Sequence, residues 1–180
     1  GYSQLTNIPF DLGLIRNHYV GRTFIEPAQK IRSLGVKLKL NANKTTVKDK
    51  IIILIDDSLV RGTTSHKIVK MLYDAGAKEV HVKIACPEIK YPDFYGVDMP
   101  TEEELLANNK NNQEMCDYIK AKSLKFLSLD GLYTALINEK RQTNYPQFSD
   151  HYFTGNYPIE PQDNLRGVKI KQLSLLSGKS

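Results

Sequence analysis

The clearest pattern in the chain is an apolar run followed by a polar turn, a helical repeat and an alternating segment. Residues 50–55 are continuously apolar after the first position, which predicts a strand buried on both faces. Residues 56–64 are polar and contain a glycine, as a turn does. In 65–75 the apolar positions share one helical face, and Gly76 is suited to end that helix. Residues 79–86 alternate and predict a second strand.

The order strand, turn, helix and strand makes a βαβ unit, which implies a parallel sheet. The predicted fold class is therefore α/β, with a parallel sheet flanked by helices. Ligands of such sheets bind beyond the carboxyl ends of the strands. The turn 56–64 follows the first strand directly, so we expect the chemistry of the chain at this turn.

Weaker patterns predict further elements. Thr101 and Glu104 have the spacing of a capping box, which predicts a helix reaching Asn108. Residues 113–119 predict another helix, and 124–129 predict a short strand.

The composition changes near the end of the chain. Asp130 is placed to cap a further helix. From Asn138 onward Asn, Pro, Gln and Tyr are frequent, which predicts an irregular tail. We therefore divide the chain into a main domain, 1–137, and a C-terminal extension, 138–180.

The chain is basic, and its positive charges gather in one region. Its 180 residues carry a formal net charge of +5, with a pI near 9.1. The cations of this region are Arg16, Arg22, Lys30, Arg32, Lys37, Lys39, Lys44, Lys48 and Lys50. Such a field favours a polyanion, either nucleic acid or a compact phosphorylated metabolite, and a solvated basic face is the simpler alternative.

Composition also argues against several classes of protein. The sequence has no apolar run of membrane-spanning length, and its hydrophobic content of 41% is ordinary for a globular domain. Cys86 and Cys116 lie far apart and lack metal-type spacing. We therefore expect two unpaired cysteines, no membrane segment and a cytoplasmic location.

The residues after the apolar run carry the candidate chemistry. Asp56 and Asp57 end a strand and point to opposite faces, so they meet different groups of a ligand, for example the two hydroxyls of a ribose and a metal-bound water. Gly62 lets the backbone approach a ligand closely. Residues 63–65 add hydroxyls beside the N–H groups of a helix start, which together bind anions. This segment predicts a ligand with a diol at one end and a phosphate at the other.

Each piece has a simpler structural interpretation. Two aspartates before a helix often cap it, and Gly-Thr-Thr-Ser is common in turns. All the pieces in order, directly after a buried strand, favour a ligand site over either interpretation.

Residues 55–64, Ile-Asp-Asp-Ser-Leu-Val-Arg-Gly-Thr-Thr, closely resemble the phosphoribosylpyrophosphate motif of the type I phosphoribosyltransferases. The motif is most similar to the version of the amidophosphoribosyltransferases. Residues 17–25, 36–41 and 95–100 resemble the same family, and the resemblance runs from residue 1 to about 158. It implies the type I phosphoribosyltransferase fold.

The resemblance also implies roles for the residues of the motif. The two aspartates bind Mg2+ and the ribose, and the glycine with the two threonines holds the 5-phosphate. The implied substrate-binding residues are Asp56, Asp57, Ser58, Arg61, Gly62, Thr63, Thr64 and Ser65.

A second implied feature lies in the basic region. Residues 19–39 resemble a flexible loop that folds over the bound substrate, with Arg22 and Lys39 as its catalytic cations. Closure brings positive charge to a pyrophosphate and removes water from the reacting centre. A closing loop explains the basic cluster better than nucleic acid does.

The implied activity is that of an amidophosphoribosyltransferase of purine biosynthesis. Ammonia, released from glutamine as glutamate forms, displaces pyrophosphate from phosphoribosylpyrophosphate and gives 5-phosphoribosylamine. Positioning and charge stabilisation supply the catalysis. The family's glutaminase domain starts with a cysteine and this chain starts with Gly1, so we expect ammonia from a domain absent here and an inactive chain in isolation.

The resemblance extends to cofactors and partners. It implies Mg2+, purine nucleotides as feedback inhibitors and a homo-oligomer in the full enzyme, with neither nucleic acid nor membrane as a partner. Some members carry an iron–sulfur cluster on cysteines. Residues 91–94 and 148–152 contain no cysteine here, and Cys86 alone does not hold a cluster, so none is expected.

Three alternatives remain open. A nucleobase phosphoribosyltransferase is disfavoured by the matches at 22–25 and 95–98. A non-catalytic fragment that binds phosphoribosylpyrophosphate or nucleotides is distinguished by binding without turnover. A basic nucleic-acid binder predicts steep salt dependence, and Tyr19 and Phe24 are its candidate stacking residues.

Overall fold

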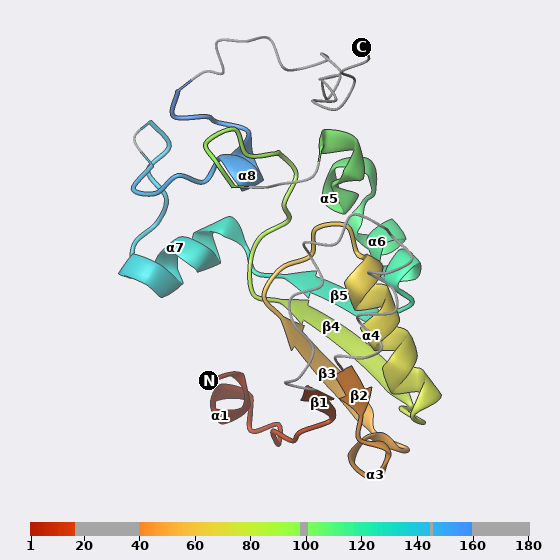
Figure 1. Ribbon diagram of the computed structural model, residues 1–180. Helices are drawn as coiled ribbons and strands as arrows, with labels where there is room; N and C mark the ends of the chain where they lie inside the picture. Colours follow the sequence, from red (N-terminus) through yellow and green to blue (C-terminus); the bar gives the residue numbers. More distant parts are fainter. Residues whose placement is uncertain (17–39, 98–100, 145, 160–180) are drawn as a thin grey trace, which may run out of the picture.

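The computed structural model of the chain describes residues 1–16, 40–97, 101–144 and 146–159. Three strands, β3 (Ile51–Asp56), β4 (Glu79–Ile84) and β5 (Ser123–Phe126), form a parallel sheet in the order β3-β4-β5. Helix α4 (Thr63–Asp74) connects β3 to β4 (Figure 1). The predicted βαβ unit and the α/β class are confirmed.

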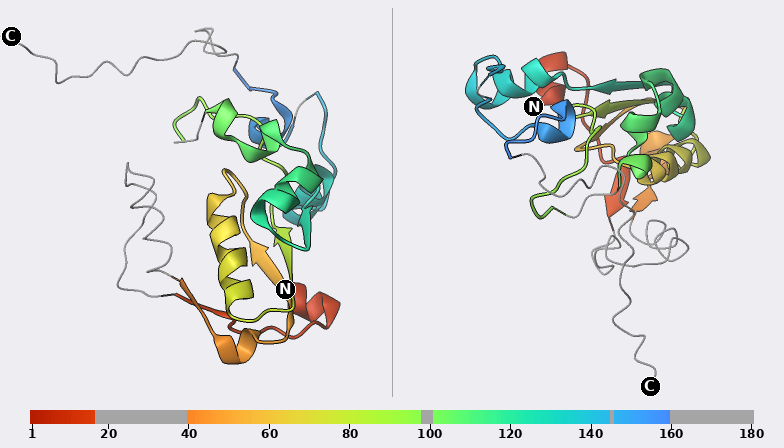
Figure 2. Two further views of the ribbon diagram at one scale, coloured as in Figure 1. Left: turned by 90° about the vertical axis from the view of Figure 1, so that its right-hand side faces the viewer. Right: turned by 90° about the horizontal axis from the view of Figure 1, so that it is seen from above.

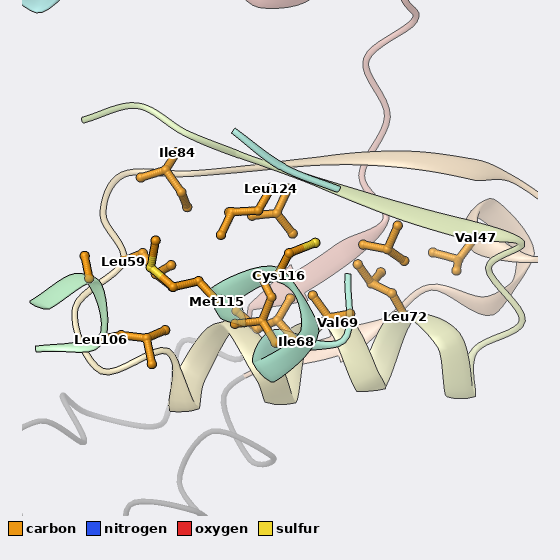
Figure 3. Close-up of a cluster of buried hydrophobic side chains, with 14 of the residues drawn as sticks. Val47, Leu59, Ile68, Val69, Leu72, Ile84, Leu106, Met115, Cys116 and Leu124 are labelled. Carbon is orange, nitrogen blue, oxygen red and sulfur yellow. The ribbon is translucent and has the colours of Figure 1, made fainter. Parts of the chain in front are cut away.

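The main core lies between the sheet and two helices on the same side of it, α4 and α6 (Asn112–Ile119) (Figures 1 and 3). Apart from Ser65, the buried positions of α4 are periodic apolar residues that predicted the helix, and alternate residues of β4 face them. The central side chains are Ile68, Val69, Leu72, Val80, Val82, Ile84, Met115, Cys116 and Leu124. This core fixes the position of the turn between β3 and α4.

The prediction that the first strand is buried on both faces is wrong for the described residues. Ile52 and Leu54 pack against the core, but Ile51 is 60% exposed and Ile55 is 46% exposed. Among the described residues β3 lies at the edge of the sheet and pairs with β4 alone. Helices α1 (Tyr2–Thr6) and α7 (Leu129–Ile137) lie on the side of the sheet away from α4 (Figure 2).

In a second sheet, β1 (Leu14–Arg16) pairs antiparallel with β2 (Leu40–Ala42). Helix α3 (Lys44–Val47) follows β2. Arg16 pairs with Leu40, so the two residues that flank the segment 17–39 lie side by side. Leu14, Leu40 and Ala42 pack against the main core. The expected loop 19–39, with Arg22 and Lys39, lies outside the described residues.

The capping box predicted at Thr101 is wrong. Thr101 begins a 3-10 helix, η2 (Glu102–Glu104), without a side-chain cap bond to another described residue, and the chain continues as α5 (Leu106–Asn109). The Glu104 carboxylate binds Arg61 instead. A capping box does form at Asn111 and Glu114 and starts α6.

The second strand boundary also shifts. Strand β5 ends at Phe126, and α7 (Leu129–Ile137) includes Leu129, which the apolar pattern assigns to the strand. The cap is Ser128 rather than Asp130, because the Ser128 hydroxyl accepts from the Gly131 N–H at 3.0 Å. Asp130 instead occupies the first turn of the helix.

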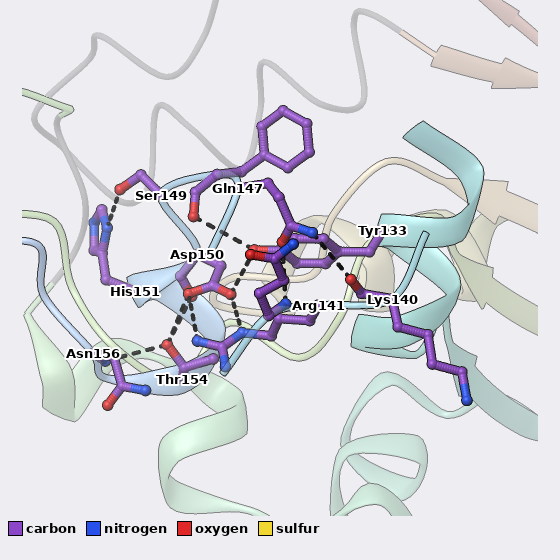
Figure 4. Close-up of polar contacts among 11 residues, drawn as sticks. Tyr133, Lys140, Arg141, Gln147, Ser149, Asp150, His151, Thr154 and Asn156 are labelled. Carbon is purple, nitrogen blue, oxygen red and sulfur yellow. Dashed lines mark hydrogen bonds and ion pairs between the residues drawn. The ribbon is translucent and has the colours of Figure 1, made fainter. Parts of the chain in front are cut away.

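The described part of the C-terminal extension is mostly irregular, as expected, but part of it is buried. A single turn, α8 (His151–Thr154), follows Asp150, and both Asp150 and His151 are buried. The Asp150 carboxylate accepts from Arg141, from the Tyr133 hydroxyl at 2.9 Å and from Thr154 (Figure 4). Hydrogen bonds to α7 and to neighbouring residues therefore order this segment. Among the described residues, none of the helices combines the length and apolar character that a membrane crossing needs.

Candidate functional site

The acidic pair lies at the carboxyl end of β3. Asp56 is the last residue of the strand, and its carbonyl accepts from the Ala85 N–H at 2.9 Å. Its Oδ1 atom accepts from the Asp57 N–H at 3.1 Å, and the Ser58 hydroxyl donates to Asp57 Oδ1 at 3.2 Å. Asp56 is half-buried and Asp57 is exposed. The pair thus presents carboxylate oxygens at the edge where ligands of parallel sheets bind.

The electrostatics of this edge favour a cation. Burial raises the pKa of Asp56, the hydrogen bond from the Asp57 N–H lowers it, and the negative charge of Asp57 raises it, with a net increase. A bound cation would favour the ionised form of both groups. Mg2+ prefers one or two protein carboxylates together with substrate phosphates, so the donor set of Asp56 and Asp57 fits that ion. A group of three or more metal-binding side chains is absent from the part of the chain that the structure describes.

Cys86 is a neighbour of the acidic pair that the sequence patterns did not identify. It follows β4, and its thiol donates to the Pro87 carbonyl at 3.2 Å. Burial and then the charge of Asp57 raise its pKa to about 11; the hydrogen bond from the Leu59 N–H opposes them, and the charge of Asp56 adds the smallest increase. The thiol is therefore protonated at neutral pH. Cys86 and Cys116 are both free.

The second half of the candidate site is the start of α4. Gly62 caps the helix in the left-handed region, with φ of 73°, and its carbonyl accepts from the His66 N–H at 2.9 Å. That bond is the first of the helix, so the N–H groups of residues 63–65 have no carbonyl partner within it. Thr63 and Thr64 are half-buried, whereas Ser65 is 3% exposed. N–H groups at a helix start and hydroxyls beside them are the kinds of donor that bind anions, and the helix dipole adds to their attraction.

The turn is supported from behind by the segment 101–119. The Leu106 N–H donates to the Val60 carbonyl at 2.9 Å. A Cβ atom on Gly62 would lie 2.6 Å from Leu106 Cδ2 and 3.0 Å from the Tyr118 ring, so glycine is required by space as well as by φ. The sequence patterns did not identify these supporting residues, because they lie far along the chain.

Arg61, expected to bind substrate, is paired with another side chain. Its Nε donates to Glu104 Oε1 at 3.2 Å, and its Nη2 donates to Oε2 at 3.1 Å. Six of the expected residues lie at the junction of β3 and α4: Asp56, Asp57, Ser58, Gly62, Thr63 and Thr64. Ser65 lies at the buried side of the same turn, and Arg61 turns toward Glu104.

Known proteins resemble this chain over nearly all of its length, although no family model matches it. The amidophosphoribosyltransferase of Rhizobium etli is 54% identical over 178 residues, which cover 98% of this chain and 36% of that protein. The chloroplastic amidophosphoribosyltransferase of Glycine max is 50% identical over 175 residues, covering 97% and 29%. The chain thus spans about a third of the length of these curated relatives.

Two solved structures are also similar to this chain. The glutamine phosphoribosylpyrophosphate amidotransferase of Bacillus subtilis, complexed with ADP and GMP, superimposes with a TM-score of 0.74 at 48% identity, covering 87% of this chain and 34% of that one. A second structure, described as the allosteric regulatory enzyme of purine biosynthesis, gives a TM-score of 0.73 at the same identity.

Proposed function

We propose that this chain carries the phosphoribosyl-transfer site of an amidophosphoribosyltransferase. The chain belongs to that family over the third of its relatives' length that it spans. The observation that supports this most is the junction of β3 and α4. An acidic pair and a helix start are joined there by one short turn, so a single ligand reaches both. Phosphoribosylpyrophosphate has the matching groups, a diol and a 5-phosphate.

We assign each half of the junction to one part of the substrate. Asp56 and Asp57 bind the ribose hydroxyls and Mg2+, which supplies positive charge to the pyrophosphate oxygens. The N–H groups at the start of α4, with the hydroxyls of Thr63 and Thr64, hold the 5-phosphate. The exposed carboxylate of Asp57 and the half-buried threonines support this division.

The proposed reaction is the first step of de novo purine biosynthesis. The lone pair of ammonia forms a bond to C1 of the ribose, the C1–oxygen bond to pyrophosphate breaks with its electrons on the leaving oxygen, and the new amine loses a proton to solvent. The products are 5-phosphoribosylamine and pyrophosphate. The chain's own groups position the substrate and stabilise charge, and none of them forms a covalent intermediate. Arg22 and Lys39 are the proposed cations for the leaving pyrophosphate.

Further partners belong to the same proposal. A glutaminase domain supplies ammonia from glutamine, and purine nucleotides compete for the 5-phosphate site. The Bacillus subtilis relative in complex with ADP and GMP supports a nucleotide site in this family. We also propose a homo-oligomer in the cytoplasm, without an iron–sulfur cluster. Relatives near 50% identity that carry the amidophosphoribosyltransferase name weigh against a nucleobase as acceptor.

Pyrophosphate release tests the proposed function. The chain, restored upstream with the corresponding part of its Bacillus subtilis relative, is mixed with phosphoribosylpyrophosphate, Mg2+ and an ammonium salt at pH 8. Pyrophosphate is measured beside Asp57→Asn and a control, Asp74→Asn, at the far end of α4. Ammonia-dependent release that Asp57→Asn loses and the control keeps supports the transfer activity. Tight substrate binding without release supports instead a non-catalytic binding domain.

A further inference from the structure

The Arg61–Glu104 pair joins the phosphate-binding turn to a segment far along the chain, with 43 positions between its members. The contact is bidentate, so it fixes the plane of the guanidinium as well as its distance. Both side chains are about half exposed, at 43% for Arg61 and 50% for Glu104. Exposed ion pairs stabilise a fold only weakly. Orientation of the turn is therefore the main consequence of this pair.

Two neighbouring contacts hold the same turn from the same side. The residue before Arg61, Val60, accepts from the Leu106 N–H, and the residue after it, Gly62, packs against Leu106 and Tyr118. Three consecutive residues of the turn are thus held by the segment 104–118. The first N–H groups of α4 follow immediately, so their direction depends on this support.

We propose that Glu104 is a positioning residue: acting through Arg61, it holds the turn before α4 in the form that receives the 5-phosphate. The inference rests on the proposed function for the identity of the ligand. It gives Arg61 a role different from the one expected from the sequence. Arg61 orients the turn, and the anion is bound by the backbone that follows.

A double-mutant cycle separates positioning from direct binding. Arg61→Gln, Glu104→Gln and the double variant are titrated with phosphoribosylpyrophosphate and Mg2+. If the two side chains act as a pair, each single change weakens substrate binding by about three- to tenfold. The double variant then binds no more weakly than whichever single variant has the lower affinity. Glu104→Asp, which keeps the charge, recovers part of the affinity. Glu103→Gln, in the same 3-10 turn, is the control and binds as the wild type does.

Two results would overturn the proposal. If Arg61 binds the ligand directly, Glu104→Gln frees it, and affinity stays the same or rises. Additive losses in the double variant would also contradict a coupled pair. In either case the thermal midpoint of each variant, expected within about 3 °C of the wild type, separates loss of the site from loss of the fold.

Hydrogen exchange of the unliganded chain keeps this inference separate from the proposed function. We expect amides in residues 57–65 to exchange about three- to tenfold faster in Glu104→Gln than in Glu103→Gln. Unchanged exchange rejects the positioning role even if the substrate binds. Faster exchange in a chain that binds no phosphoribosylpyrophosphate supports the positioning role and rejects the proposed ligand.

Discussion

The Nε2 atom of His151 lies 2.8 Å from Oδ1 of Asp93, and 58 positions separate the two residues. Both side chains are almost fully buried, at 2% and 1% exposed. The other ring nitrogen, Nδ1, lies 2.9 Å from the Ser149 hydroxyl, and the Tyr95 ring packs edge-on against the imidazole at 5.2 Å. A buried polar contact therefore ties the C-terminal extension to the loop after β4.

This contact makes the chain sensitive to acid. Burial alone would raise the pKa of Asp93, but hydrogen bonds from the Val97 N–H, the His151 ring, the Tyr95 N–H and Tyr152 lower it, with a net decrease. Since the folded carboxyl has the lower pKa, its contribution to stability is complete above the unfolded pKa of about 3.9 and is lost as the pH falls through the folded pKa.

We expect Asp93→Asn to lower the free energy of unfolding by about 3 kcal/mol at pH 7, because it removes one partner of a buried pair. It should also make the loss of stability below about pH 4 less steep. Urea unfolding followed by circular dichroism at pH 7 and pH 3 measures both effects. Asp74→Asn, whose side chain is 63% exposed, serves as the control and should change stability by less than about 1 kcal/mol. Equal stability of Asp93→Asn and wild type at pH 7 would contradict a structural role for this pair.

Gly62→Ala tests the shape of the turn before α4, where we propose that the 5-phosphate binds. The new Cβ would lie 2.6 Å from Leu106 Cδ2, and the alanine would have to keep a backbone φ of 73°. We therefore expect a loss of about 2 kcal/mol in the free energy of unfolding and weaker substrate binding. Gly96→Ala is the matched control, since Gly96 also has a positive φ, of 112°, but open space around its Cβ. It should lose about 1 kcal/mol and bind normally. Equal losses of stability in both variants would show that packing against Leu106 does not matter.

The thiol of Cys86 reports on the acidic pair. With a pKa of about 11, it should react with iodoacetamide at pH 8 more slowly than an ordinary cysteine, in buffer without divalent ions. Its rate should keep rising toward pH 11. Asp57→Asn removes one of the charges that raise this pKa and should increase the rate at pH 8. Mass spectrometry of the Cys86 peptide measures the rates, and an ordinary rate with a midpoint near pH 8.5 would be inconsistent with the geometry.

Local patterns predicted the elements that depend on local sequence. The apolar run, the polar turn and the periodic helix produced β3, the site loop and α4 nearly at their observed bounds. At Glu104 the capping pattern was misleading, because Arg61 competes for the carboxylate from a distant position. At Ser128 a hydroxyl two residues before the expected cap took the place of Asp130.

Contacts between distant residues were not predictable in this way. Asp93 and His151 show no spacing that signals their pairing, since the fold alone brings them together. The exposure of Ile51 and Ile55 was missed for a related reason: a continuous apolar run does not reveal which face is covered. The acidic pair and the helix start could be proposed as a site from the sequence because they belong to one continuous segment.

Calorimetric titration of the folded chain with phosphoribosylpyrophosphate and Mg2+ tests most directly the claim that the junction of β3 and α4 binds this substrate. The wild type is compared with a double variant, Asp56→Asn with Asp57→Asn, and with the control Asp74→Asn. The proposed site predicts saturable binding by the wild type and the control, and at least about tenfold weaker binding by the double variant, a difference of about 1.4 kcal/mol. Equal affinity in all three proteins, or no binding by a folded wild type, would contradict it.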